Sequence, residues 1–506
     1  MSKDIGPANA NEVLHLAISL QPGRAEELEQ FANSVSDPMS PMYKQFMTPA
    51  QIGQVFGAPK AEVDRVVNFL KSKGLKVTLV ADNRMSILAE GTVQQAQSAF
   101  STKIRQYSGP SPDGTQTVQF RANETPVMLP TTIASRILDV SGLENYTRPT
   151  PRATTTKLTP ALARNLYQIA PIYVNPTQAG QGRTIGISNW DGYKLSNADL
   201  FITQYGLPYP AAGKHSNVQI VKIDGGSGQG RAQGEGDLDI QMVLSQAPLA
   251  TVKIFDGKGG DLVNVLTVEA NDPAVDIISE SWGWSLPAAT ATAAHNQHLS
   301  MTVSGKTYMA ASGDYGTTLE PYSYPNYDAE VLMVGGTVAT VDSTTGARVS
   351  EVAWSGGGGG WSTNTATFNV KPSYQTVTYP GVTANKRWCP DLALHADGGG
   401  TGGFYFYYRG LLYTGSGTSF SSPVFAGALG LAEQKLLSLG KTTGNGRLGR
   451  FQNWLYTHNT VAGLFFDVTS GNNGNLPSGQ ASNAIAGWDF CTGFGAMNFN
   501  AFVNGY

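Results

Sequence analysis

Short apolar runs and amphipathic stretches alternate along the larger, C-terminal part of the chain. The apolar runs have the length of buried strands and lie near residues 184–188, 218–223, 251–256, 275–279, 307–311 and 331–334. The stretches between them have the apolar spacing of helices and lie near residues 196–205, 235–246, 261–270 and 287–298. This alternation predicts an α/β fold in which helices cover both faces of a parallel sheet.

The first part of the chain has a different order of elements. Its pattern predicts strand 12–20, helices 24–36 and 60–73, strands 76–80 and 85–90, helix 92–100, and strands 103–107 and 117–121. That order is similar to the β-α-β-β-α-β arrangement of ferredoxin-like domains. We therefore predict an α+β domain over residues 1–145 and a second domain over residues 158–506. Residues 146–157 between them are rich in Thr, Pro and Arg, which is typical of an exposed linker that proteases can reach.

Composition and charge exclude some classes of function. Charged residues make up 14% of the 506 residues and the formal net charge is -3, so we expect no surface for nucleic acid. The chain has no run of about 18 apolar residues that could span a membrane, and residues 1–6 lack a signal-peptide core. If the protein is exported, its signal lies outside this sequence. The two cysteines, Cys389 and Cys491, could pair or stay free.

A serine-rich segment, Ser416–Pro423, precedes a long apolar stretch that predicts a helix over residues 424–437. Helix N-termini carry unpaired backbone N–H groups and the positive end of the helix dipole, so Ser419 lies where negative charge would be stabilised. The sequence also fits an ordinary capping segment. Its G-T-S-x-x-x-P pattern, however, is similar to the nucleophile motif of the subtilisin-like clan of serine peptidases.

A serine nucleophile needs a general base, and the six histidines are not in the sequence context that subtilisins use. Glu235 and Asp239 are one helical turn apart, on a helix face that they share with apolar residues. Burying two like charges lowers stability unless they share a proton. We therefore infer that the pair has a function. We expect Glu235 to be the general base and Asp239 to orient it. We expect Asp237 to face solvent.

Acyl transfer also needs a donor for the oxyanion. Asp314, in the segment Ser312–Gly316, could fill that role if it is protonated, because only a neutral carboxyl donates a hydrogen bond. The same Gly-Asp-x-Gly pattern is ordinary turn chemistry, so a turn cap is the alternative.

Together, E-x-x-x-D, S-G-D and S-G-T-S, in this order along the chain, resemble the sedolisin family of serine-carboxyl peptidases, to which kumamolisin belongs. The likeness extends to the N-terminal domain, because residues 36–49 resemble motifs of the activation domain of pro-kumamolisin-type zymogens. It implies a subtilisin-like catalytic domain whose catalytic residues are Ser419, Glu235, Asp239 and Asp314. One departure is Asn189, near the position where kumamolisin-like members have an additional glutamate, which argues against a longer carboxylate relay.

Two C-terminal segments, residues 467–473 and 486–493, resemble the calcium-binding segments of that family. Their oxygen-rich composition suits a hard cation, although a pair of Asx turns is the alternative. The resemblance implies one Ca²⁺ per catalytic domain, held by the side chains of two residues and the carbonyls of three: Asp467, Asp489, Val468, Ile485 and Gly487.

The resemblance implies a secreted, monomeric, acid-active endopeptidase that is made as a self-processing zymogen. Its substrates would be proteins or peptides, and its own prodomain would be an intramolecular inhibitor. A tripeptidyl peptidase of the same family and an inactive, calcium-stabilised binding protein on the same fold are the alternatives. An ester or lipid hydrolase is disfavoured, because the G-x-S-x-G elbow of that class is not the motif around Ser419.

Overall fold

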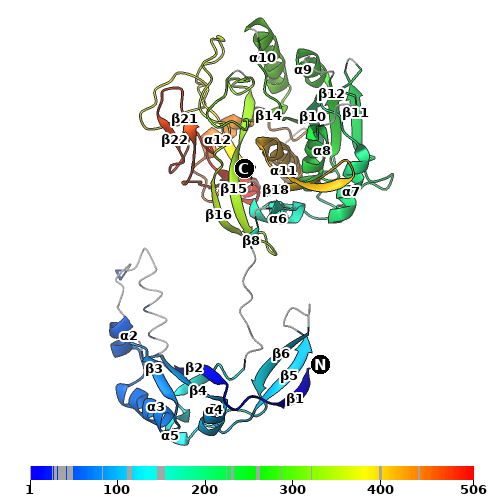
Figure 1. Ribbon diagram of the computed structural model, residues 1–506. Helices are drawn as coiled ribbons and strands as arrows, with labels where there is room; N and C mark the ends of the chain where they lie inside the picture. The colour runs from blue at the N-terminus through cyan, green and yellow to red at the C-terminus, as the bar shows by residue number, and fades with distance from the viewer. Residues whose placement is uncertain are drawn as a thin grey trace. The chain divides into compact units, whose positions relative to one another are not determined.

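The computed structural model divides into two compact units, Met1–Pro151 and Arg152–Tyr506 (Figure 1). It describes residues 2–24, 27, 31, 41–42, 49–82, 84–110, 117–144, 154–155, 157–223, 225–228, 233–257, 262–286, 288–320, 322–397, 402–442 and 445–506. Most of the predicted helix 24–36, most of the motif residues 36–49 and most of the predicted linker lie outside the described residues.

The first unit contains the predicted ferredoxin-like arrangement, although its last strand was assigned wrongly. The elements are β2 (Val13–Leu20), α3 (Lys60–Ser72), β3 (Lys76–Val80), β4 (Ser86–Thr92), α4 (Val93–Phe100) and β7 (Ile137–Ser141). The strands form an antiparallel sheet in the order β3-β4-β2-β7. Its buried face includes Leu14, Leu16 and Ile18.

The strands predicted near 103–107 and 117–121 belong to a second sheet. They form the hairpin of β5 (Ile104–Pro110) and β6 (Thr117–Asn123), which pairs with β1 (Lys3–Pro7). Short helices α2 (Pro49–Val55) and α5 (Thr131–Ala134) complete the described elements of this unit. Periodicity identified these strands but could not identify their partners, because pairing depends on contacts between distant segments.

The second unit is built on a parallel sheet, as predicted. Its parallel strands are β10 (Thr184–Asn189), β11 (Val218–Lys222), β12 (Thr251–Asp256), β13 (Ile277–Glu280), β14 (Thr307–Ala311) and β15 (Val331–Asp342). They lie in the order β11-β12-β10-β13-β14-β15. Beyond them, β16 (Arg348–Ala353) is antiparallel to β15, and β17 (Leu392–His395) is parallel to it.

Helices cover both faces of this sheet. The helix α8 (Glu235–Gln246) and the helix α11 (Thr418–Ser438) pack on one face, where Ile277 and Met309 are buried. The helices α9 (Leu262–Asn271) and α10 (Ala288–Val303) pack on the other, where Ile278 and Tyr308 are buried. Neighbouring residues of one strand therefore enter different cores, which explains why the strands are apolar throughout.

Smaller elements surround this core. The helices are α6 (Pro160–Leu166), the 3₁₀ helix η1 (Ala170–Ile172), α7 (Leu195–Tyr205), α12 (Phe451–His458) and α13 (Phe499–Gly505). The short strands are β8 (Thr154–Thr155), β9 (Lys157–Leu158), β18 (Gly403–Tyr408), β19 (Leu411–Gly415), β20 (Phe465–Phe466), β21 (Asn472–Asn475), β22 (Ala481–Asn483) and β23 (Ala496–Met497). No helix in the described part of the chain is both long and apolar enough to cross a bilayer.

The C-terminal end of the predicted linker 146–157 belongs to the second unit. Strand β8 pairs with Val341 and Asp342 of β15, and Lys157 pairs with Gly403 of β18. Composition alone could not reveal these backbone pairs, because their partners lie far away in the sequence.

Helix α11 begins six residues earlier than predicted, at Thr418 rather than Val424. Pro423 lies inside the helix and has no N–H to offer to the carbonyl of Ser419, four residues earlier. The Ser281 hydroxyl oxygen lies 3.4 Å from that carbonyl oxygen, while its proton is donated to Asp239 Oδ1 at 2.8 Å. The proline therefore leaves the Ser419 carbonyl without a helical partner, and this carbonyl faces Ser281 at the end of β13.

Close packing of α8 against α11 depends on Gly427. A Cβ atom at this position would lie 2.8 Å from the carbonyl oxygen of Val243 and 3.0 Å from Cβ of Gln246. We predict that Gly427→Ala lowers the free energy of unfolding by about 1 to 3 kcal/mol through overpacking. This is opposite to the gain of about 0.5 to 1 kcal/mol that alanine usually brings to a helix interior.

Thermal unfolding followed by circular dichroism measures this effect. Leu439→Ala is the control, because Leu439 lies at the end of the same helix with 49% of its surface exposed and should change stability little. A Tm of Gly427→Ala at or above that of the unmodified chain would contradict the role of Gly427.

Candidate active site

Ser419 and Glu235 meet where the first turns of α11 and α8 come together. Burial raises the pKa of Glu235 to about 7, and hydrogen bonding with Ser419 opposes that rise. The charges of Asp314 and Asp191 raise the pKa of Glu235 further. A carboxyl with a raised pKa beside a serine hydroxyl can accept a proton from that hydroxyl.

Asp239 lies one turn further along α8 and is 1% exposed. Its Oδ1 atom accepts a hydrogen bond of 2.8 Å from the Ser281 hydroxyl, which follows the end of β13. Burial raises its pKa well above the ordinary value, and the negative charge of Glu235 raises it further. Asp239 Oδ2 and Glu235 Oε1 are buried and have no hydrogen-bond partner among the described residues.

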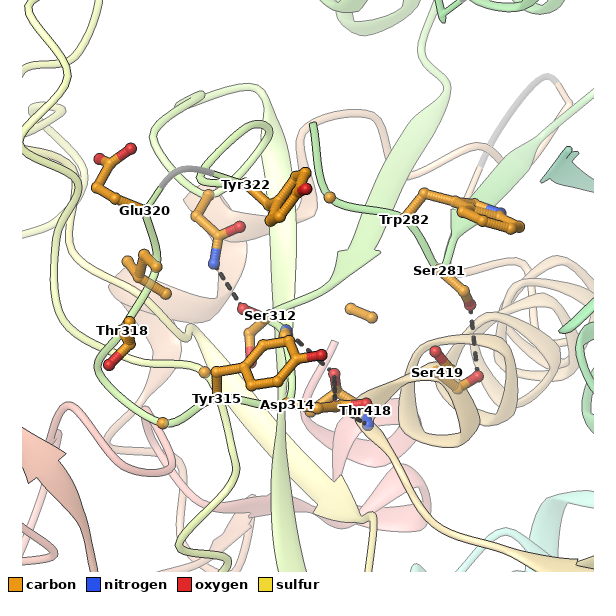
Figure 2. Close-up of a pocket in the computed structure, with 17 residues that line it drawn as sticks. Ser281, Trp282, Ser312, Asp314, Tyr315, Thr318, Glu320, Tyr322, Thr418 and Ser419 are labelled. Atoms are coloured by element: carbon orange, nitrogen blue, oxygen red, sulfur yellow. Dashed lines mark hydrogen bonds between the residues drawn. The ribbon is translucent and has the colours of Figure 1, made fainter. Parts of the chain in front are cut away.

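Asp314 follows β14 and faces the start of α11. The backbone N–H and the hydroxyl of Thr418 each donate a hydrogen bond of 2.8 Å to its Oδ1 atom (Figure 2). Desolvation raises its pKa above the ordinary 3.8, although the two Thr418 donors oppose the rise. Gly417 leaves room for the second oxygen, because a Cβ atom there would lie 2.9 Å from Oδ2.

A pocket of about 600 Å³ connects Asp314 to Ser419. Both residues line it, together with Ser281 and Trp282 on one side and Tyr315 and Tyr322 on the other (Figure 2). The structure thus places the expected nucleophile and the expected oxyanion donor at one cavity, whereas Glu235 and Asp239 are not among the residues that line it.

Sequence reasoning missed Asp191, which holds the start of α8. Its carboxylate accepts hydrogen bonds from the backbone N–H groups of three residues, at 2.9 to 3.0 Å: Gln233, Gly234 and Glu235. Such a carboxylate satisfies N–H groups that have no partner within the helix and interacts favourably with the helix dipole. No local capping pattern could identify it, because it lies 44 residues before Glu235.

Asn189 is buried, and its side-chain amide contacts Asp191 and Asp256. Its side-chain amide donates to the Asp191 carbonyl at 2.7 Å and to Asp256 Oδ1 at 3.1 Å. Asn189 therefore supports the residue that caps α8.

The prediction that Asp237 faces solvent is wrong. Asp237 is 2% exposed, and its Oδ1 atom accepts hydrogen bonds from the Lys194 backbone N–H and from the Asn197 side-chain amide. Helix α7 covers the face of α8 that periodicity had assigned to solvent, and a helix buried on all sides gives little amphipathic signal.

Two histidines are buried and form hydrogen bonds away from Ser419. His298 is 1% exposed and lies 2.9 Å from Asp328, and His395 Nδ1 accepts a hydrogen bond from the Ala339 backbone N–H. No histidine is among the described residues that line the pocket at Ser419.

Both cysteines are free and buried, which answers the question that the sequence left open. Burial raises the pKa of Cys389 to about 11 and that of Cys491 to about 12. Thiols with such raised pKa values are poor nucleophiles at neutral pH.

The expected calcium ligands lie in two loops that are in contact. Asp467 Oδ2 accepts a hydrogen bond of 2.8 Å from the Gly487 N–H. Asp489 is fully buried, and burial raises its pKa to about 7 although four hydrogen bonds oppose the rise. No described donor bonds to the carbonyl oxygens of Val468, Ile485 and Gly487. Two carboxylates and three free carbonyls suit Ca²⁺.

Comparisons with known proteins identify relatives of both units. The profile described as the pro-kumamolisin activation domain matches residues 1–146, and the subtilase family profile matches residues 223–490. Sedolisin of Pseudomonas sp. (strain 101) is 27% identical over 97% of this chain and 86% of its own length. Kumamolisin of Bacillus sp. (strain MN-32) is 26% identical over 97% of this chain and 91% of its own length.

A solved structure of Pseudomonas sedolisin, complexed with two molecules of pseudo-iodotyrostatin, has the same fold. It covers 70% of this chain and 98% of its own chain, with 24% identity and a TM-score of 0.56. This likeness confirms the predicted subtilisin-like fold. The subtilase profile spans more than half of the chain, behind an activation-domain profile, so the chain belongs to the subtilase family as a sedolisin-type serine peptidase with an N-terminal prodomain.

Proposed function

We propose that this peptidase is an acid-active serine-carboxyl endopeptidase that uses Ser419, Glu235 and Asp239 as a triad. The observation that carries the proposal is the buried carboxyl of Glu235 beside the serine at the start of α11. This carboxyl can accept the proton of the serine hydroxyl, and no histidine is among the described residues that line the pocket.

In the proposed reaction, Ser419 Oγ attacks the carbonyl carbon of the scissile peptide while its proton moves to Glu235. Asp239 stabilises the protonated Glu235 by sharing that proton, and Ser281 keeps Asp239 in place. Neutral Asp314 donates its proton in a hydrogen bond to the oxyanion. Glu235 then protonates the leaving amine, and water hydrolyses the acyl-enzyme by the same steps in reverse order.

We also propose that the protein is made as a secreted, monomeric zymogen inhibited by its own N-terminal unit. The activation-domain profile over residues 1–146 supports this. Cleavage would fall within the predicted linker 146–157 and before Thr154, because β8 and β9 are hydrogen-bonded to strands of the second unit. Acidification would trigger release, because it protonates carboxylates and so removes their ion pairs.

The C-terminal loops would hold one Ca²⁺ through Asp467, Asp489 and the carbonyls of Val468, Ile485 and Gly487. The ion would neutralise carboxylates that otherwise repel each other, and would thus act as a staple rather than take part in catalysis.

Ser419→Ala should abolish cleavage of a protein substrate and of the linker, with a loss of roughly 10⁴-fold or more. Glu235→Gln should lose about 10² to 10⁴-fold, because the amide cannot accept the proton. N-terminal sequencing of the acid-treated chain measures processing, and peptide mapping of a cleaved protein distinguishes endopeptidase from tripeptidyl activity. Ser438→Ala, at the exposed end of the same helix, is the control. Self-processing that persists in Ser419→Ala would refute the assignment.

The pH profile of kcat/KM should be bell-shaped, with its maximum below pH 7. Ionised Glu235 is lost as pH falls below its raised pKa of about 7, and neutral Asp314 is lost as pH rises above its own raised pKa. The product of the two populations is largest between these two pKa values. Asp314→Asn should remove the decline of kcat/KM at higher pH, since an amide donates a hydrogen bond to the oxyanion at any pH. A maximum near or above neutrality in the unmodified enzyme would instead indicate a histidine base.

Chelation should lower the Tm of the enzyme, because an ion that binds only the folded state stabilises it by about 2.7 kcal/mol at a hundredfold excess over Kd. In Asp467→Asn the Tm should no longer respond to calcium. Asp64→Asn, which removes an exposed carboxylate of the first unit, should retain the response. Differential scanning calorimetry with calcium and with chelator tests this, and equal Tm values in the unmodified enzyme would identify the loops as Asx turns.

A further inference from the structure

The charged side chains among the described residues that line the pocket beside Ser419 are all acidic. Two acids, Asp314 and Glu320, line it, whereas its described lining residues include no lysine, arginine or histidine. Figure 2 shows Glu320 on the side of the pocket opposite Ser419. The mechanism proposed above gives a role to Asp314 and none to Glu320.

The proposed mechanism determines which part of a substrate enters the pocket. Ser419 attacks the carbonyl carbon, and Asp314 binds the oxygen of the same group. Because both residues line one pocket, the residue that contributes this carbonyl places its side chain there. This residue is the P1 residue, on the acyl side of the cleaved bond.

Glu320 is held in place without a counter-charge. Its Oε1 atom accepts a hydrogen bond of 2.5 Å from the Ser362 hydroxyl, and its Oε2 atom accepts one of 2.8 Å from the Ser323 hydroxyl. Among the described residues no cation forms an ion pair with it. A fixed, exposed carboxylate without a cationic partner is available to a cationic ligand.

The walls of the pocket suit a long side chain with a polar end. Tyr315 and Tyr322 are 81% and 63% exposed, so their rings can cover an aliphatic stem and interact with a cation. Ser312 also lines the pocket, is 2% exposed, and its hydroxyl has no hydrogen-bond partner among the described residues. A purely apolar side chain would leave this hydroxyl unsatisfied, which is costly.

We propose that Glu320 selects substrates with lysine or arginine at P1. The inference rests on the proposed peptidase mechanism and specifies its substrate class. The aliphatic stem lies between Tyr315 and Tyr322, and the cationic end reaches Glu320. An acidic P1 residue is repelled by the same carboxylate.

Three peptides that differ only at P1 test this proposal: lysine, Nε-acetyl-lysine and glutamate. Acetyl-lysine keeps the stem and removes the charge. The self-processed full chain should cleave the lysine peptide with a kcat/KM about tenfold above that of the acetyl-lysine peptide, as expected for one charge-assisted hydrogen bond. In Glu320→Gln, which keeps the size of the side chain, this ratio should fall toward one. In Glu320→Lys the glutamate peptide should become preferred over the lysine peptide.

Asp199→Asn is the matched control, since Asp199 is an acid of the same unit that pairs with His215 and does not line the pocket. It should keep the lysine preference. Circular dichroism of each variant verifies folding. Cleavage without a lysine preference, or a preference that survives in Glu320→Gln, would overturn the proposal and leave the peptidase mechanism intact. If the processed chain cleaves no peptide with any P1 residue, both the mechanism and this proposal fail.

Discussion

Burial of two carboxyl groups one helical turn apart is the constraint on which the catalytic unit depends. Burial raises the pKa of both Glu235 and Asp239. The negative charge of Glu235 raises the pKa of Asp239 further. Such a pair would weaken an ordinary core. Here hydrogen bonds from the hydroxyls of Ser419 and Ser281 oppose the rise in pKa.

The parallel sheet brings the groups around this pair to one edge. Asp191 follows β10, Ser281 follows β13 and Asp314 follows β14, each within three residues of the carboxyl end of its strand. Parallel strands end on the same side of a sheet, and ligands bind at that side in open α/β folds. Asp191 then holds the start of α8, so the sheet edge and the helix that carries Glu235 are joined by hydrogen bonds from three backbone N–H groups.

The C-terminal loops are connected to the pocket wall as well as to each other. The Asn473 carbonyl accepts a hydrogen bond of 3.0 Å from the Thr317 N–H, and the Asn473 side chain donates to the Gly357 carbonyl at 2.8 Å and to the Phe490 carbonyl at 3.1 Å. Phe490 follows Asp489, one of the expected calcium ligands. An ion that stabilises these loops would therefore also stabilise the segment from Asp314 to Glu320, which forms much of the pocket.

The sequence by itself determined the two-part organisation, the parallel sheet and the candidate residues Ser419, Glu235 and Asp314, because strand and helix periodicity and short motifs are local properties of a chain. Only the tertiary structure decided the partner of β7, the capping of α8 by Asp191 and the burial of Asp237. Each of these depends on a segment distant in sequence: β2 for β7, the end of β10 for α8, and α7 for Asp237. Local patterns cannot specify such contacts, because the free energy that selects them comes from packing and hydrogen bonding formed after the elements meet.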